Sequence, residues 1–290
     1  MCLIVFESDT HPDYHLVLGA NRDEFYERPT APARFWSDAP HVLAGRDRKA
    51  GGTWMGITRQ GYWAAITNVR DLDAHDPEAP SRGHLVSDFL VEEPDPADYL
   101  RAVSERAEAY NGFNLLVGSP AGIWYLSNYD SGLRAVEPGV HGLSNHLLDT
   151  SWPKVDQARD QLRQASLRSE GELRVGGGED APPEAGDARH PRATDGTAPP
   201  DPVDVMLDLL DDREPFPDDH LPDTGVGQEK ERMLSPLFID GDQYGTRSST
   251  VLLIGHDGHV TLAEKTFREG TADATRRFTF EIQPDAVRKP

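Results

Sequence analysis

The chain has 290 residues, and its 50 acidic residues against 29 basic ones give a formal net charge of -21 and a sequence pI near 4.8. This charge argues against a nucleic-acid-binding protein, because such proteins need a basic footprint to bind a polyanion. The sequence has no apolar run long enough to span a membrane and no signal-peptide pattern, so we expect a cytoplasmic protein without a membrane span.

The opening quarter of the chain predicts antiparallel β structure. Apolar-rich runs at 2–8 and 15–21 flank a polar turn, Asp9-Thr10-His11-Pro12-Asp13, which is typical of two strands joined in a hairpin. Two further strands are expected at 52–58 and 62–68, joined by a short turn.

Helices and strands follow in the middle of the chain. Helical periodicity predicts a helix over 81–92, with Ser81 as its N-cap, and a second over 96–110, with Asp95 as its N-cap. We expect a third helix over 152–167, after strands at 113–118, 123–128, 133–137 and 140–145.

The segment 169–201 is rich in Gly, Pro, Asp and Glu and poor in apolar residues, which predicts a disordered acidic insertion.

Strands joined by short turns pair antiparallel, and helices that arrive in pairs cover the faces of sheets. We therefore predict an α+β fold in one domain over 1–290, a four-layer αββα sandwich of two antiparallel sheets. A single large α+β sheet is the alternative. The remaining elements are expected as helices at 202–210 and 228–234 and strands at 248–256, 259–267 and 278–282.

The type of charge is also biased, with 24 Arg against 5 Lys and 31 Asp against 19 Glu. This bias is typical of a halophilic, salt-adapted protein, since molar salt shortens the Debye length to ~3 Å and screens the repulsion among carboxylates. An acidic protein from a GC-rich genome would also favour Arg over Lys.

Cys2 is the only cysteine in the chain, and it directly follows Met1. Methionine aminopeptidases generally remove Met1 when the second residue is small, and Cys2 would then carry both a thiol and a free α-amine. An α-amine has a pKa of about 7.7 to 8.0, so it can take the thiol proton and act as general base. The alternative interpretation is a buried cysteine that serves as a small apolar residue on a core strand.

Charged residues are expected beside Cys2. In a hairpin, the end of the second strand returns to the start of the first, so Arg22 and Asp23 should lie near Cys2. The guanidinium would favour the thiolate, and the carboxylate could orient the N-terminal ammonium. Arg247, just before a predicted strand, offers a second cation. A solvated loop with an Arg/Asp ion pair is the alternative.

Two asparagines, Asn68 and Asn145, each end a predicted strand. Their amides could donate to the oxyanion that forms when a thiolate attacks a carbonyl, although asparagine is also common in turns. Trp54 and Trp63 are expected either to pack in the core or to line an apolar pocket. The histidines show no metal-ligand spacing, so no metal site is predicted.

The glycine-rich segment around 45–54 lacks the Gly-Lys-Ser/Thr ending of a phosphate loop and precedes a strand. We expect its glycines to allow close backbone packing or a bulge.

Seven ordered blocks of sequence together resemble the NRDE family, also called the transport and Golgi organisation protein 2 family, over nearly the whole chain. These blocks are Met1-Cys2-Leu3-Ile4-Val5-Phe6, Ala20-Asn21-Arg22-Asp23-Glu24-Phe25, Ala44-Gly45-Arg46-Asp47, Gly51-Gly52-Thr53-Trp54, Thr67-Asn68-Val69-Arg70, Gly142-Leu143-Ser144-Asn145-His146 and Tyr244-Gly245-Thr246-Arg247-Ser248. The resemblance implies the αββα sandwich of N-terminal nucleophile hydrolases.

More distantly, the candidate residues are similar in type and order to the site of the cholylglycine hydrolase and penicillin V acylase group, in which a processed N-terminal cysteine cleaves an amide. The residues that carry this similarity are Cys2, Arg22, Asp23, Asn145 and Arg247. On the same analogy, Asn68 is a further oxyanion or orienting residue. The NRDE family itself has been linked to haem handling and to lipid or acyl-coenzyme A metabolism.

Our leading hypothesis is an N-terminal cysteine amidohydrolase-like protein that cleaves a small, partly apolar amide or thioester. Such an enzyme would hydrolyse non-peptide carbon-nitrogen bonds or thioester bonds and would require no cofactor. The alternative is a non-catalytic protein that uses the same pocket to carry haem, a lipid or acyl-coenzyme A. A third hypothesis, an interaction protein, rests only on the insertion at 169–201. The sequence does not fix the oligomeric state.

Overall fold

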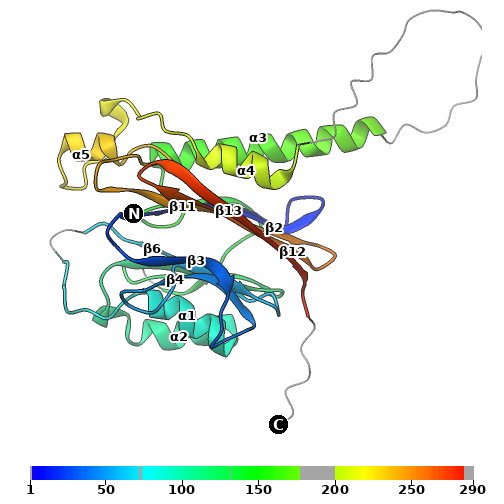
Figure 1. The fold of residues 1–290 in the computed structure, drawn as a ribbon, viewed down its shortest axis with the longest axis horizontal. Helices are drawn as coiled ribbons and strands as arrows, with labels where there is room; N and C mark the ends of the chain where they lie inside the picture. Colours follow the sequence, from blue (N-terminus) through cyan, green and yellow to red (C-terminus); the bar gives the residue numbers. More distant parts are fainter. Residues whose placement is uncertain (1, 72–73, 131, 177–199, 284–290) are drawn as a thin grey trace, which may run out of the picture.

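The computed structural model describes residues 2–71, 74–130, 132–176 and 200–283. Two antiparallel sheets stack face to face, and helices cover the outer face of each (Figure 1). The predicted α+β sandwich of four layers is therefore confirmed, and the alternative of a single large sheet is wrong.

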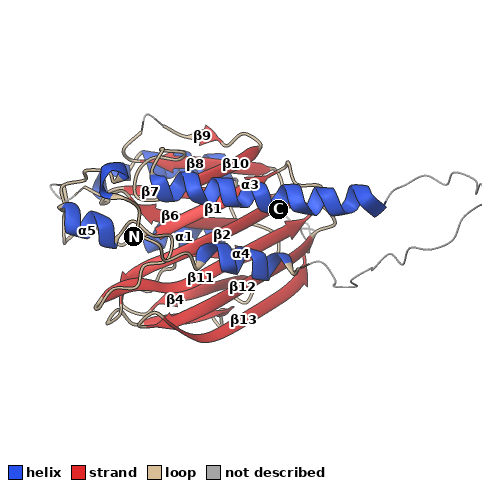
Figure 2. Ribbon diagram, turned by 90° about the horizontal axis from the view of Figure 1, so that it is seen from above, coloured by secondary structure: helices blue, strands red, loops and turns tan. Residues whose placement is uncertain are grey.

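The first sheet has the strand order β10-β1-β2-β11-β12-β13. Its strands are β1 (Cys2–Ser8), β2 (Tyr14–Phe25), β10 (Gly139–Leu143), β11 (Tyr244–Gly255), β12 (His259–Arg268) and β13 (Thr271–Glu281). The helices α3 (Pro153–Gly176) and α4 (Pro202–Leu210) cross its outer face, and α5 (Gln228–Met233) lies beyond the end of the sheet at which β1 begins (Figure 2).

The second sheet has the order β3-β4-β5-β6-β7-β8-β9. Its strands are β3 (Thr30–Phe35), β4 (Val42–Asp47), β5 (Met55–Thr58), β6 (Trp63–Asn68), β7 (Phe113–Ser119), β8 (Gly122–Ser127) and β9 (Arg134–Ala135). Its outer face is covered by α1 (Gly83–Glu92) and α2 (Pro96–Ser104). Two short 3-10 helices complete the described elements, Ala107–Ala109 and Asp218–His220.

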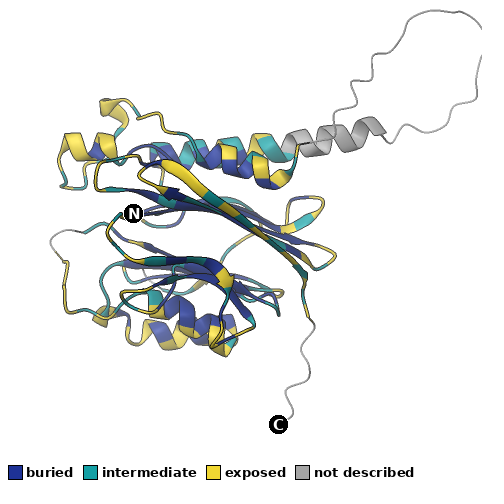
Figure 3. Cartoon of the chain, in the orientation of Figure 1, coloured by how far each residue is buried: buried dark blue, intermediate teal, exposed yellow. Residues whose placement is uncertain are grey.

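The core has three apolar layers, because the central strands of each sheet are buried on both faces, whereas the edge strand β13 is largely exposed (Figure 3). In β1, Ile4 and Phe6 pack between the sheets, whereas Leu3 and Val5 pack against the helices. Side chains alternate between the two faces of a strand, so a strand that is covered on both sides needs apolar residues at successive positions. This explains the unbroken apolar run that opens the chain.

The structure contains two strands that the sequence patterns did not predict, β3 and β4. β3 includes Pro32, which cannot donate a backbone hydrogen bond, but β3 is an edge strand of its sheet and tolerates the proline there. β4 ends in the charged pair Arg46 and Asp47, which hid its strand character. The predicted strand at 52–58 is correspondingly shorter, because it begins at Met55.

The helix boundaries also differ in detail. Asp95 caps α2 as predicted, since its side chain accepts a hydrogen bond from the backbone N–H of Asp98 at 3.0 Å. Ser81 does not cap α1, which begins at Gly83 without a side-chain cap. The helix predicted over 96–110 ends at Ser104 and continues as a 3-10 turn.

The segment predicted to be a disordered insertion, 169–201, is only partly described. Its first residues continue helix α3 as far as Gly176, and 177–199 lie outside the described residues. The stretch at 170–174 contains Glu, Leu and Arg, which are good helix formers, so a scarcity of apolar residues did not end the helix.

The side chain of Asn21 links the first sheet to the helical layer by hydrogen bonds. Its amide nitrogen donates to the backbone carbonyls of Leu210 and Leu237, each at 2.8 Å, and its amide oxygen accepts from the Ser249 hydroxyl at 2.6 Å. The side chain is almost fully buried, so these groups would have no access to water if Asn21 were removed.

We expect Asn21→Ala to lower the free energy of unfolding by about 2 to 4 kcal/mol, because each buried polar group that loses its partner costs about 1 to 3 kcal/mol. Urea denaturation followed by circular dichroism measures this change. The matched control is Gln243→Ala, at an exposed position. A loss no larger than that of the control would contradict the structural role assigned to Asn21.

Candidate functional site

Cys2 lies at the start of β1, between two strands that carry other candidate residues. It pairs directly with Arg22 of β2. On the other side of β1, Ile4 pairs with Leu143, the last residue of β10. The next residue, Ser144, donates from its hydroxyl to the Cys2 backbone carbonyl at 3.1 Å, which places the neighbouring Asn145 beside the start of β1. Directly opposed residues of an antiparallel pair share a face, so Cys2 and Arg22 both face the space between the sheets, and Asn145 lies at the same end of it.

The three residues Asn21, Arg22 and Asp23 do not face the same way. Arg22 shares the inner face with Cys2, where its guanidinium stacks 4.5 Å from the ring centroid of Trp54. Asn21 and Asp23 face the helical layer, because side chains alternate along a strand. One short motif therefore supplies a cation to the space between the sheets and a carboxylate to the layer behind it.

The Cys2 thiol is partly buried and accepts a hydrogen bond from the backbone N–H of Asp23. Burial raises its pKa above that of an ordinary cysteine, the nearby Asp23 charge adds to this rise, and the Arg22 guanidinium opposes it. Burial outweighs the arginine, so the thiol is predominantly protonated at neutral pH and needs a base to become a nucleophile.

Asp23 is buried, with 3% of its surface exposed. Its carboxylate accepts a hydrogen bond from the Thr246 hydroxyl at 2.7 Å, and its backbone carbonyl accepts one from the Tyr244 hydroxyl at 3.0 Å. Burial raises the pKa of Asp23, whereas the positive charge of Lys154 and the Thr246 hydrogen bond lower it. Because β1 and β2 are antiparallel and Cys2 faces Arg22, the backbone nitrogen of Cys2 lies toward the Asp23 end of β2.

Lys154, in the first turn of α3, is the cation behind Asp23. It is only 4% exposed, and its ammonium donates to the backbone carbonyl of Leu234 at 2.8 Å. Burial lowers the pKa of Lys154 to about 8, although the charges of Asp23 and Cys2 act to raise it. Lys154 and Asp23 are thus two buried, oppositely charged groups, each shifted by burial toward its neutral form.

Asn145 joins the two sheets next to Cys2. Its side-chain amide nitrogen donates to the backbone carbonyl of Asn68 at 2.9 Å, and its backbone carbonyl accepts from the backbone N–H of Arg70 at 2.9 Å. An amide has two N–H bonds, and the second has no partner among the described residues. Ser144 completes the link, because its hydroxyl donates to the Cys2 carbonyl at 3.1 Å. The side chain of Asn68 is exposed at the end of β6.

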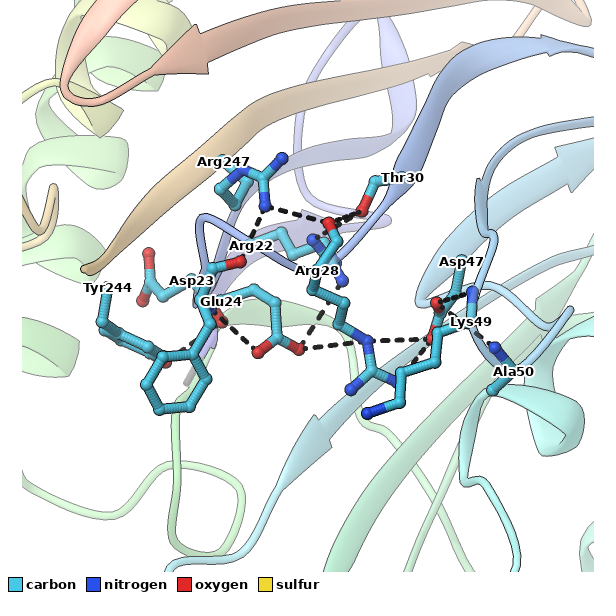
Figure 4. Close-up of polar contacts among 11 residues, drawn as sticks. Arg22, Asp23, Glu24, Arg28, Thr30, Asp47, Lys49, Ala50, Tyr244 and Arg247 are labelled. Carbon is cyan, nitrogen blue, oxygen red and sulfur yellow. Dashed lines mark hydrogen bonds and ion pairs between the residues drawn. The ribbon is translucent and has the colours of Figure 1, made fainter.

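Arg247 lies at an irregularity in β11. Thr246 pairs with Asp23 and Ser248 pairs with Arg22, so Arg247 is the extra residue of a β-bulge. A bulge redirects one side chain, and Arg247 donates to the backbone carbonyls of Phe25 and Arg28 at 2.8 and 3.2 Å (Figure 4). It therefore fixes the turn after β2, and it forms no ion pair with any carboxylate of the described residues.

A chain of ion pairs leads away from Arg22 (Figure 4). The carboxylate of Glu24 lies 3.6 Å from both Arg22 and Arg28, and Arg28 contacts Asp47 at 2.6 Å. Arg22 is 6% exposed, so this chain and the ring of Trp54 hold its guanidinium in one position. Charge-assisted contacts of this kind are geometrically specific, in contrast to solvated ion pairs.

The glycines of the 45–54 segment allow this arrangement. A Cβ atom on Gly45 would lie 2.2 Å from the Trp54 ring, and one on Gly52 would lie 2.5 Å from the backbone of Gly83. The expectation of close packing is therefore confirmed. Trp63 is a core residue, whereas Trp54 is partly buried and lines a cavity of about 450 Å³ together with Arg247 and Ser248.

Four residues near the site were missed by the sequence reasoning: Ser144, Lys154, Thr246 and Arg82. Burial lowers the pKa of Arg82 while the charge of Cys2 raises it, so Arg82 is a further cation that interacts electrostatically with Cys2, and its guanidinium donates to the backbone carbonyl of Gly112 at 2.7 Å. Ser144 and Thr246 belong to two of the seven blocks quoted above and could have been noticed there. Lys154 had a weaker signal, as one of only five lysines in the chain.

Among the described residues, no group of three or more His, Cys, Asp or Glu side chains could hold a metal ion. His146, the last residue of the block that contains Asn145, is exposed and hydrogen-bonded through Nδ1 to Thr150 at 2.9 Å. The described helices include none that is long and apolar enough to cross a membrane.

Comparison with known families identifies the chain's relatives. The family model described as Transport and Golgi organisation 2 matches residues 1–269. The chain belongs to the Transport and Golgi organisation 2 family. The human Transport and Golgi organization protein 2 homolog is 33% identical over 306 residues, covering 98% of this chain and 100% of its own length.

Other members of the Transport and Golgi organisation 2 family match to a similar extent. The homolog from Mus musculus is 31% identical, covering 97% of this chain and 99% of its own. The Drosophila melanogaster protein is 28% identical and covers 92% of each chain. The resemblance seen in the seven sequence blocks is thus confirmed.

Solved structures give weaker likenesses to this family member. A Caenorhabditis elegans N-acylethanolamine-hydrolyzing acid amidase ortholog has 11% identity and a TM-score of 0.38, covering 87% of this chain and 92% of its own. A mutant conjugated bile acid hydrolase from Clostridium perfringens has 12% identity and the same TM-score, covering 98% of each chain. Likenesses at this level carry no information about substrate.

The Cys2 thiol should titrate above an ordinary cysteine in protein that retains Met1, because burial favours its neutral form. The rate of iodoacetamide alkylation against pH measures this, and the same cysteine in urea-unfolded chain is the reference. Arg22→Gln should move the pH midpoint of the alkylation rate higher still. Arg59→Gln, which removes an arginine stacked on Phe35, should not move it. A folded midpoint at or below the unfolded one would contradict the expectation.

Lys154 should make stability depend on pH. Its pKa falls from 10.5 to about 8 on folding, so between these values the unfolded chain binds one proton more than the folded chain. The free energy of unfolding should therefore rise with pH across this window by up to about 3 kcal/mol, and Lys154→Met should lack the rise. Urea denaturation at several pH values tests this. The control, Lys265→Met, should retain the rise. If the free energy of unfolding changed equally with pH in wild type and in Lys154→Met, the expectation would be refuted.

Proposed function

We propose that this protein is an N-terminal cysteine hydrolase of small amides or thioesters, formed when Met1 is removed. The observation that carries the proposal is the pairing of Cys2 with Arg22, with Asn145 on its other side and buried Asp23 behind its backbone nitrogen. This combination supplies a nucleophile, a cation, an amide donor and a carboxylate within one end of the sandwich.

In the proposed reaction, the α-amine of Cys2 accepts the thiol proton and the thiolate attacks the substrate carbonyl carbon. A carbon-sulfur bond forms, and the carbonyl oxygen becomes an oxyanion. Its hydrogen-bond donors would be the second amide N–H of Asn145 and the Asn68 amide. The intermediate expels the amine or thiol, which takes the proton from the α-ammonium. A water molecule, deprotonated by the same amine, then hydrolyses the acyl-enzyme to a carboxylic acid and free Cys2.

The charged residues have separate proposed roles. Arg22 lowers the pKa of the thiol and so stabilises the thiolate. Asp23 would hold the α-ammonium, and Lys154 would keep Asp23 ionised, since its charge lowers the Asp23 pKa. Arg247 would place a second positive charge on the lining of the neighbouring cavity.

Intact-mass analysis tests the first requirement, because retention of Met1 would exclude the α-amine as base. Protein that has lost Met1 should form a transient acyl adduct with the p-nitrophenyl ester of octanoic acid, and Cys2→Ala should form none. The single cysteine makes the adduct assignable by peptide mapping.

Direct acylation of the Cys2 thiol by the activated ester must be distinguished from catalysis. Asn145→Ala retains Cys2 but should lower the acylation rate by about a hundredfold or more, as expected for loss of one oxyanion donor. Asn111→Ala, an asparagine of the α2–β7 connection, is the control and should react like wild type. Thermal unfolding shows whether Asn145→Ala is folded. Labelling that survives Cys2→Ala would defeat the catalytic assignment and favour a carrier of lipid, acyl-coenzyme A or haem.

A further inference from the structure

A cavity of about 450 Å³ adjoins the candidate site on the side of Arg22. It lies over the inner face of β11, β12 and β13 and is bordered by the turn after β2. We call it the donor cavity. Its lining includes Tyr26, Trp54, Arg247, Ser248, Glu264 and Arg276. Trp54 connects it to the site, because the same ring stacks on Arg22.

Three buried polar atoms of the donor cavity have no hydrogen-bond partner among the described residues. They are the hydroxyl oxygen of Tyr26, the hydroxyl oxygen of Ser248 and one terminal nitrogen, Nη1, of Arg276. Ser248 is 4% exposed, so its hydroxyl has no ready access to solvent. Buried polar groups nearly always have a hydrogen-bond partner. Three unpaired groups along a single cavity indicate a ligand that supplies the missing hydrogen bonds.

The chemistry of these atoms indicates the kind of ligand. The guanidinium of Arg276 can only donate, and the two hydroxyls can also donate, so the complementary group is an oxygen that accepts several hydrogen bonds. Arg247 and Arg268 add positive charge to the lining, and Glu269 and Asp273 add negative charge, so the case for an anionic ligand rests on the unpaired donors. A carboxylate has two oxygens that together accept about four hydrogen bonds, which matches this set.

Glu264 limits the charge of the ligand. It is almost fully buried, directly opposite Arg276 on the neighbouring strand, and accepts a hydrogen bond from the backbone N–H of Ala33 at 2.7 Å. Burial raises its pKa, while Arg276 and Arg22 lower it. A singly charged carboxylate can share the cavity with this group more easily than a phosphate dianion, which would add a second negative charge beside it.

We propose that the donor cavity binds the carboxylate group of a small organic acid through Tyr26, Ser248 and Arg276. Resting on the proposed function, we further infer that this group is the remote end of the substrate whose amide or thioester is cleaved at Cys2. Ser248 lies two strands from Cys2 in the same row across the sheet, which corresponds to about 10 Å. The substrate class is therefore an amide or thioester with a carboxylate about this far from the bond that breaks.

Equilibrium binding tests the cavity without requiring turnover. The probes are octanedioic acid monoamide and octanediamide, which have the same length and differ in one terminal carboxylate. Isothermal titration calorimetry on Cys2→Ala protein should show about tenfold tighter binding of the monoamide. Adding Arg276→Gln should remove most of this preference, and adding Tyr26→Phe or Ser248→Ala should weaken it severalfold.

The matched control is Arg277→Gln. Arg277 is the next residue of β13 and pairs with Asp201 away from the cavity, so this change should leave the preference intact. Equal binding of the two probes, or a preference unaffected by Arg276→Gln, would overturn the proposal. Tighter binding of octyl phosphate than of octanoate would overturn the assignment to a carboxylate.

The proposed function can fail independently of this binding site. Absence of an acyl adduct on Cys2, with the carboxylate preference intact, would reject the hydrolase and retain the binding site. A normal acyl adduct on Cys2 without the carboxylate preference would reject the binding site and retain the hydrolase. With an active enzyme, the carboxylate should lower KM for the amide substrate in wild type, and Arg276→Gln should raise KM by about tenfold with kcat little changed.

Discussion

The register between β1 and β2 is the constraint on which the candidate site depends. Because Cys2 pairs with Arg22, the thiol and the guanidinium share the inner face of the sheet, and Asp23 is left to face the helical layer. A slip of one residue would reverse every side chain and put an arginine among the apolar residues below α3 and α4. The apolar faces of β1, with Ile4 and Phe6 inside and Leu3 and Val5 outside, make such a slip costly.

The site also contains a group of buried charges, which would be unfavourable in the apolar layers without partners of opposite charge. Asp23 and Lys154 are both almost fully buried, and their opposite charges partly offset the cost of removing each from water. Removal of one side chain would leave the charge of the other buried without a partner of opposite sign. The pair therefore adds little net stability to the fold but strongly constrains the positions of both side chains. A site that must hold an N-terminal ammonium benefits from a carboxylate that is fixed in this way.

The cavity beside the site depends on packing at a distance from it. Gly45 makes room for the Trp54 ring, the ring supports Arg22, and Arg22 separates the thiol from the donor cavity. The β-bulge at Arg247 places a second cation on the border of the same cavity. Small backbone features of two different sheets thus determine which charges meet between them.

The N-terminal hairpin, the layered α+β class, the cap at Asp95 and the residue types near Cys2 could all be predicted from the sequence, because each follows from local periodicity or from the antiparallel return of a short hairpin. The sequence did not reveal β3 and β4, whose edge position and charged end mask their strand character, or the helical start of the 169–201 segment. Two further features became visible only in the folded chain: Lys154 and Arg82 approach the site, and Tyr26, Ser248 and Arg276 line one cavity. These residues come from distant parts of the chain, and the pairing of β2 with β11, β12 and β13, together with the stacking of the two sheets, brings them together through contacts that no local pattern encodes.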